Sequence, residues 1–183
     1  MFVKLTTKPG RDTEPATDPL VMLLACHVRI RDHLALAKRL VDAVEPSPDE
    51  VMEAAAALLR YFGQALPLHI LDEDVTLREA LMVMGRPVAD EAVHAITTMT
   101  AEHSVIEPMI DEAMKQWQSL IEQPHLLPQL RHELTRDPLR LSTLLEAHLS
   151  AEEKQIFPLI HKVLTEDERA ELARRMRERR QAG

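Results

Sequence analysis

Histidine and glutamate residues recur in this sequence at a spacing that suits metal binding. His69 and Glu73 stand four residues apart in HILDEDVTL, and His148 and Glu152 repeat this spacing in HLSAEEKQI. Residues at i and i+4 of a helix lie on the same face, with Cβ atoms roughly 5 to 6 Å apart. Each pair could therefore offer an imidazole nitrogen and a carboxylate oxygen to one shared ligand.

The two motifs belong to a longer internal repeat. His27 and His103 occupy equivalent positions upstream of them, in CHVRIRDHLALAKRLV and EHSVIEPMIDEAMKQW. Each half of the chain therefore predicts a helical hairpin, with one His on its first helix and a His-x-x-x-Glu motif on its second. A four-helix bundle built from both hairpins would direct all six side chains inward.

These six residues favour a metal site over separate structural roles. A single His on an apolar face usually packs, but four in phase, beside two carboxylates that are costly to bury when ionised, indicate a cation. Imidazole and carboxylate without thiolate suit Fe, Mn or Zn. If two ions shared the carboxylates, open coordination positions would remain for O2, NO, peroxide or a bridging oxo group. The candidate ligands are His27, His69, Glu73, His103, His148 and Glu152.

Helical phase, at about 100° per residue, predicts which neighbouring polar residues face the candidate ligands and which face solvent. Glu107 follows His103 by four residues and is a further candidate, as an extra ligand, a partner of a ligand or a surface ion. We expect four flanking acids to be solvated charges or partners of the ligands: Asp72, Asp74, Glu102 and Glu153. Cys26, beside His27, is expected to be a small packing residue. The remaining histidines are expected to face solvent or to lie in a connector: His33, His94, His161, His125 and His132.

The composition predicts an all-α fold that positions these residues. Four glycines in 183 residues, with abundant Leu, Ala, Met, Glu and Arg, favour long helices. Helix-start signals occur at Asp18-Pro19, Ser47-Pro48, Asp137-Pro138 and Thr165 with Glu168. We expect helices near 19–44, 49–84, 88–122, 138–163 and 165–181, with Pro67, Pro108 and Pro158 kinking or breaking theirs. The expected organisation is an irregular arm at 1–18, a four-helix bundle at 19–164, and a C-terminal helix and tail at 165–183.

Charge and composition exclude several classes of function. The net charge of −8 argues against nucleic-acid binding, and the basic run Arg174–Arg180 reads as the solvated end of a helix. We expect no signal peptide, and no apolar stretch approaches the roughly 20 residues of a membrane span. One cysteine excludes a disulfide framework and a cysteine zinc site. We expect a cytoplasmic protein without a membrane or nucleic-acid partner, and its oligomeric state stays open.

The six positions, followed by Ile156-Phe157-Pro158, resemble the hemerythrin-like HHE cation-binding family over nearly all of residues 19–163. The resemblance implies a four-helix bundle of two HHE-type hairpins around a non-haem di-iron centre, for which Zn or Mn could substitute. It also implies that the four histidines are terminal ligands, while Glu73 and Glu152 bridge the two iron ions.

Departures from the oxygen-carrying members shape the expected function. Glu107 stands where those carriers have a second His, and the fourth-helix acid follows its His by four residues rather than five. The site is therefore more similar to the symmetric centres of bacterial iron–sulfur repair and stress-response proteins. However, the repair proteins carry an additional cysteine-pair domain, and residues 1–17 of this sequence contain no cysteine, so we expect no counterpart of that domain there.

We expect the protein to bind or react with O2, NO or peroxide in bacterial redox or nitrosative stress or in iron homeostasis. A sensor or carrier is favoured over a dedicated catalyst. One alternative is an iron-handling enzyme or an iron donor for iron–sulfur repair. A ferritin-like oxidase is disfavoured because Glu91 and His94 form the only Glu-x-x-His pair within an expected helix. A metal-free helical interaction bundle is the remaining alternative.

Overall fold

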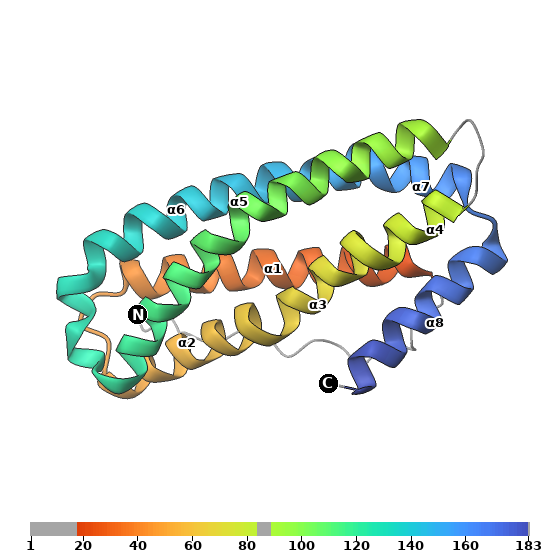
Figure 1. The fold of residues 1–183 in the computed structure, drawn as a ribbon. Coiled ribbons are helices and arrows are strands. Elements are labelled where there is room, and N and C mark those ends of the chain that lie inside the picture. Colours follow the sequence, from red (N-terminus) through yellow and green to blue (C-terminus); the bar gives the residue numbers. More distant parts are fainter. Residues whose placement is uncertain (1–17, 84–88, 183) are drawn as a thin grey trace.

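The computed structural model describes residues 18–83 and 89–182, and these residues contain helices but no strand (Figure 1). The expected arm lies almost wholly outside the described residues. Short π-helical (η1, η2, η4) and 3-10 (η3) segments join or precede some of the α-helices. The elements are α1 (Pro19–Asp42), α2 (Pro48–Arg60), η1 (Tyr61–Ala65), α3 (Leu66–Leu71), η2 (Asp72–Leu77), α4 (Arg78–Val83), α5 (Ala89–Glu122), η3 (Pro124–Leu126), α6 (Leu127–Ala151), η4 (Glu152–Ile156), α7 (Phe157–Val163) and α8 (Glu166–Ala182).

Four long rods form the bundle. They are α1, the continuous run from α2 to α4, α5, and the run from α6 to α7 (Figure 1). Contacts between α1 and α2, α2 and α5, α5 and α6, and α6 and α1 close the ring. The additional helix α8 packs against α1 and η2. The prediction of an all-α four-helix bundle with a C-terminal helix is confirmed.

The apolar core is divided into two clusters, and the six candidate ligands lie between them along every rod. On α1, His27 follows Leu23 of one cluster and precedes Ile30 of the other. The larger cluster centres on Trp117 and Phe62, whereas the smaller one includes side chains of α7 and α8. The bundle therefore positions a polar layer between two apolar layers that exclude water from both sides.

The start of α6 corrects a sequence prediction. We expected a helix from residue 138, but α6 begins at Leu127 and continues through that position. Leu127, Leu134, Leu141 and Leu145 are all buried along one side of the helix. Packing of this continuous apolar face outweighs the local signal of Asp137-Pro138, because tertiary contacts supply most of a helix's stability.

Proline and π-helical segments occur together near the candidate ligands. The π-helical segment η1 precedes Pro67, and η4 precedes Pro158. Glu73 and Glu152 lie in the π-helical segments η2 and η4. Such turns are rare and often mark functional sites. Pro108, in contrast, lies inside a helix that bends but continues (Figure 1).

Within the described ranges, no helix is both long and apolar enough to cross a membrane.

Candidate metal centre

The structure brings all six candidate ligands together in the middle of the bundle. They form two groups, and within each group ligand atoms from all four residues lie within 4.8 Å of one another. No candidate ligand is more than 4 % exposed. One group consists of His27, His69, Glu73 and Glu152, and the other consists of His103, His148, Glu73 and Glu152. The two glutamates therefore belong to both.

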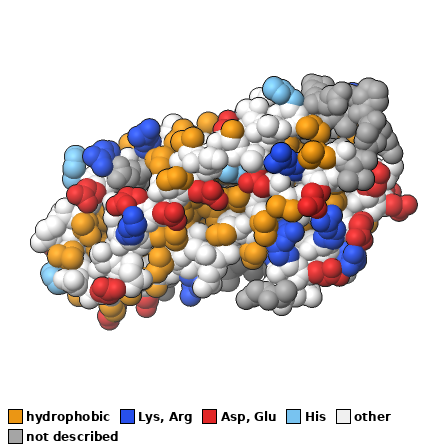
Figure 2. Space-filling model, viewed as in Figure 1, with side chains coloured by type: hydrophobic (Ala, Val, Ile, Leu, Met, Phe, Trp, Pro, Cys, Tyr) orange, Lys and Arg blue, Asp and Glu red, His pale blue; other side chains and the backbone are white. Residues whose placement is uncertain are grey.

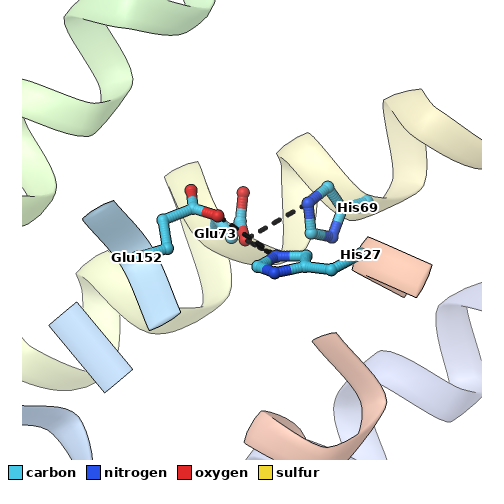
Figure 3. Close-up of side chains that lie close together, drawn as sticks. All are labelled: His27, His69, Glu73 and Glu152. Carbon is cyan, nitrogen blue, oxygen red and sulfur yellow. Dashed lines mark ion pairs between the residues drawn. The ribbon is translucent and has the colours of Figure 1, made fainter. Parts of the chain in front are cut away.

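In the first group, the imidazoles of His27 and His69 face the two carboxylates (Figure 3). His27 Nε2 lies 3.1 Å from Glu152 Oε2 and 4.0 Å from Glu73 Oε1. His69 Nε2 lies 3.4 Å from Glu73 Oε1. Three rods contribute these side chains, so the group forms only when the bundle is assembled.

In the second group, the same carboxylates present their other oxygens. His148 Nε2 lies 2.9 Å from Glu152 Oε1, and His103 Nε2 lies 3.6 Å from Glu73 Oε2. The two imidazole Nε2 atoms are 3.0 Å apart. Each glutamate thus offers one oxygen to each group, so the six residues could hold a cation in either group.

Unpartnered polar atoms show that a cation fits this donor set. Among the described residues, both carboxylates and both ring nitrogens of His69 lack hydrogen-bond partners, as does His27 Nε2. Buried polar groups are normally hydrogen-bonded. Several of these atoms are close enough to form ion pairs, but they do not have hydrogen-bonding geometry. Divalent cations bound to imidazole Nε2 and carboxylate oxygen would satisfy all of these atoms except His69 Nδ1.

Three acidic residues orient histidine rings through hydrogen bonds to Nδ1, the ring nitrogen that does not face the two shared carboxylates. The Nδ1–H groups of three histidines donate to carboxylates: His27 to Glu153 at 2.8 Å, His103 to Asp74 at 3.0 Å and His148 to Glu102 at 2.7 Å. An ionised carboxylate only accepts hydrogen bonds, so the inward Nε2 keeps its lone pair when the ring is neutral. This pattern holds metal-binding histidines in the required tautomer. Of the two roles considered for these acids, the structure shows that of partners.

Arg31 and Phe157 add contacts that sequence reasoning missed. Arg31 donates to Glu153 at 2.7 Å, and Glu153 in turn accepts from His27. Phe157 stacks on the His27 ring, with centroids 5.3 Å apart. The signal for Arg31 was its position four residues after His27, on the same side of α1.

The shared carboxylates set the protonation of the metal-free centre. Burial disfavours charge on His27 and His148, but the adjacent carboxylate of Glu152 outweighs it and raises their pKa values to about 10 and about 9. Burial would raise the pKa of Glu152, yet those histidines lower it to about 2. Burial and the charge of Glu152 raise the pKa of Glu73 to about 7, and burial lowers that of His69 to about 3.

We therefore predict that metal affinity rises with pH. His27 and His148 carry protons at pH 7 in the metal-free protein, and each ion must displace one of them. Because both pKa values are raised, the competition persists until the pH passes about 9 to 10. The affinity of each ion should increase about tenfold per pH unit between pH 7 and 9. Zn²⁺ titrations at several pH values, in buffers of different ionisation enthalpy, measure affinity and proton release. An affinity independent of pH would contradict the prediction.

A pocket reaches the centre from the surface. It has a volume of about 650 Å³ and extends from exposed Thr98, Glu102 and Gln155 to buried His148 and Glu152. Two residues of the second group therefore form part of the pocket wall. A cavity of about 10 Å³ also adjoins His69, His103 and His148, which is about the space that one water molecule needs.

Glu107 does not join the centre. It is exposed, belongs to neither group and lines a surface pocket with Leu66 and Ile70. The candidate assignment as an extra ligand is not supported by this geometry. Apolar side chains, including Ile106, fill the interior at this level of the bundle, so the carboxylate stays at the surface.

The remaining histidines lie outside both groups. His94 and His161 are exposed, as expected. His125 and His132 are also exposed, but His125 lies in η3 and His132 on α6 rather than in an irregular connector, because α6 begins at Leu127. The prediction for His33 was wrong, because its ring is partly buried and stacks on Tyr61 with centroids 3.8 Å apart. Its Nδ1 also donates to the Arg29 carbonyl at 2.7 Å. An aromatic neighbour on the adjacent helix was not visible from the phase of α1 alone.

Asp72 and the C-terminal basic run also differ from expectation. Asp72 is fully buried and forms ion pairs with Arg179 and Arg180 of α8. It is therefore neither a solvated charge nor a hydrogen-bond partner of a ligand. Arg179 and Arg180, in the last part of the basic run, are correspondingly only partly exposed, because tertiary packing turns them toward η2. Cys26 is a buried, free cysteine, in keeping with its expected packing role.

Comparison with protein families matches residues 18–160 to the model of the hemerythrin HHE cation-binding domain. Comparisons with curated proteins and with solved structures gave no significant match. The matched range contains all six candidate ligands and ends before α8.

Proposed function

Because the chain belongs to the hemerythrin HHE cation-binding family, we propose that it is a non-haem di-iron protein that binds or reacts with O2, NO or peroxide. The observation that carries this proposal is that the two carboxylate oxygens of each glutamate face different donor groups. Glu73 places its two oxygens toward His69 and His103, and Glu152 places its two toward His27 and His148. Two ions could thus share two bridging carboxylates.

Iron bound there would supply open coordination positions and a change of oxidation state. The chain holds three of the four imidazole rings by their Nδ1–H bonds, and a ring held in this way would direct a neutral Nε2 toward a bound ion beside the two carboxylates. Apolar side chains on both sides keep bulk water away. The pocket beside His148 gives a small ligand a route to the second group.

The donor set supports binding without showing a dedicated catalytic group. The pocket residues Glu102 and Gln155 are exposed, and Glu102 is already held by His148. We therefore favour a sensor or carrier in redox or nitrosative stress or iron homeostasis over a dedicated catalyst. A cytoplasmic location remains part of this proposal.

Anaerobic reconstitution with ferrous iron tests the proposal. We expect about two iron ions per chain, matching the two donor groups. Oxidation in air should then produce near-ultraviolet absorption from carboxylate- or oxo-bridged ferric iron, and NO should change the spectrum of the reduced protein. His161→Ala, which alters an exposed histidine, is the matched control and should bind as much iron as the wild type. Absence of iron after reconstitution would overturn the proposal, and one tightly held Zn²⁺ ion would indicate a structural site instead.

A further inference from the structure

The C-terminal helix α8 lies beyond the residues that match the family, yet it packs against two rods of the metal centre. It contacts α1, which carries His27, and η2, which carries Glu73 (Figure 1). Acidic and basic side chains are interspersed over this part of the surface (Figure 2). Over the part of α8 whose burial is described, the buried apolar residues are Leu172, Ala173 and Met176. Because this apolar face is small, polar contacts must contribute to holding the helix in place.

The main polar contact joins α8 to the residue beside a candidate bridging ligand. Arg179 donates to Asp72, and the guanidinium of Arg180 lies 2.5 Å from the other Asp72 oxygen. Arg179 also donates to the Thr76 hydroxyl at 2.9 Å. Asp72 and Thr76 are both fully buried. These contacts therefore fix two side chains of the π-helical segment that contains Glu73.

A second set of contacts connects α8 to His27. Arg180 lies 3.8 Å from the Sγ atom of Cys26, the residue before His27. Leu172 and Met176 belong to the same apolar cluster as Phe157, whose ring stacks on His27. The helix thus adjoins neighbours of two candidate ligands that lie on different rods.

We propose that Arg179 and Arg180 are positioning residues of the metal centre, which couple the docking of α8 to metal binding through Asp72. The inference rests on the proposed metal-binding function. A buried carboxylate without its cationic partners is strongly destabilising, so undocking of α8 would disturb η2 and the placement of Glu73. Coupling between two sites is reciprocal, and bound metal must therefore stabilise the docked helix.

Metal affinity tests the first half of this coupling. We expect Arg179→Gln to weaken binding of Fe²⁺, measured anaerobically by competition with a chromophoric chelator, by about tenfold or more. Arg174→Gln is the matched control on the same helix, because Arg174 is exposed and pairs with Glu171 and Glu178 of α8 itself. Wild-type affinity in Arg179→Gln and in the double variant Arg179→Gln/Arg180→Gln would overturn the inference while leaving the proposed function intact. Failure of the wild type to bind iron would overturn both.

A rescue experiment identifies Asp72 as the link. Adding Asp72→Asn to Arg179→Gln/Arg180→Gln removes the unpaired buried charge and should restore most of the lost affinity. If affinity stays reduced after Asp72→Asn is added, the arginines do not act through Asp72, and the proposed coupling through Asp72 would be overturned.

Hydrogen exchange tests the reciprocal effect without relying on activity. We expect amides of α8 in the wild-type protein to exchange at least about tenfold more slowly when Fe²⁺ is bound, because local opening becomes less favourable. In Arg179→Gln/Arg180→Gln, metal should slow exchange in α5 but much less in α8. Equal exchange in α8 with and without metal in the wild type would overturn the coupling.

Discussion

Replacing Glu73 with Gln is expected to reduce iron from two ions per chain to none that is measurable after gel filtration. Glu73 supplies an oxygen to each of the two donor groups. A neutral amide is a poor substitute for a bridging carboxylate, because it removes a negative charge that two cations share. Elemental analysis after anaerobic reconstitution measures the loss. Glu107→Gln makes the same chemical change at an exposed position outside both groups and should retain wild-type iron.

The same variant should remain folded without metal, which separates loss of binding from loss of structure. Burial and the charge of Glu152 raise the pKa of Glu73 to about 7, above its ordinary value of 4.5. Ionisation of Glu73 therefore disfavours the folded, metal-free protein increasingly as the pH rises from 4.5 through 7. Gln lacks this ionisation, so metal-free Glu73→Gln should melt at or above the wild-type temperature at pH 8. A large fall in its melting temperature would contradict this account.

Removing iron from the wild-type protein is expected to lower its melting temperature by at least about 15 °C. A ligand that binds only the folded state at a thousand times its Kd contributes about 4 kcal/mol, and two ions contribute about twice that. For a chain of this size, each kcal/mol corresponds to roughly 2–4 °C. Metal also relieves the burial of carboxylates that lack hydrogen-bond partners. Calorimetry of the iron-loaded protein before and after chelation measures the change.

A control on chelation is available in Glu73→Gln. If the chelator acts only by removing iron, the melting temperature of this variant should not change when the chelator is added. Equal melting temperatures of iron-loaded and chelated wild type, with iron content verified in both, would show that the centre contributes nothing to stability. Such a result would contradict the account of the buried donors as groups that need a cation.

Sequence periodicity was enough to locate the candidate ligands. Four histidines and two glutamates share one helical phase across an internal repeat, and the structure places all six in one buried layer. The helix starts at Pro19 and Pro48 were also predictable, because the side chains of the preceding residues, Asp18 and Ser47, cap these helices. These features depend on residues within a few positions of one another, which a linear reading can use.

Features that depend on two elements required the tertiary structure. Helix α6 starts eleven residues earlier than its local signal indicated, because its apolar face packs along the bundle. Glu107 has a phase close to that of His103, but apolar side chains occupy the interior beside it. His33 was expected in solvent and instead stacks on Tyr61 of the neighbouring rod. Phase within one helix cannot specify what the adjacent helix presents.

The sequence by itself determined the donor types, their repeat and the class of fold, because helical periodicity converts spacing into a shared face. Tertiary structure decided which carboxylate each ring contacts, where a pocket reaches His148, and how the C-terminal arginines pair with Asp72. The physical reason is that Arg179 and Asp72 lie 107 positions apart. Only the packing of α8 against η2 could show that a basic run at the end of the chain neutralises a buried acid beside the centre.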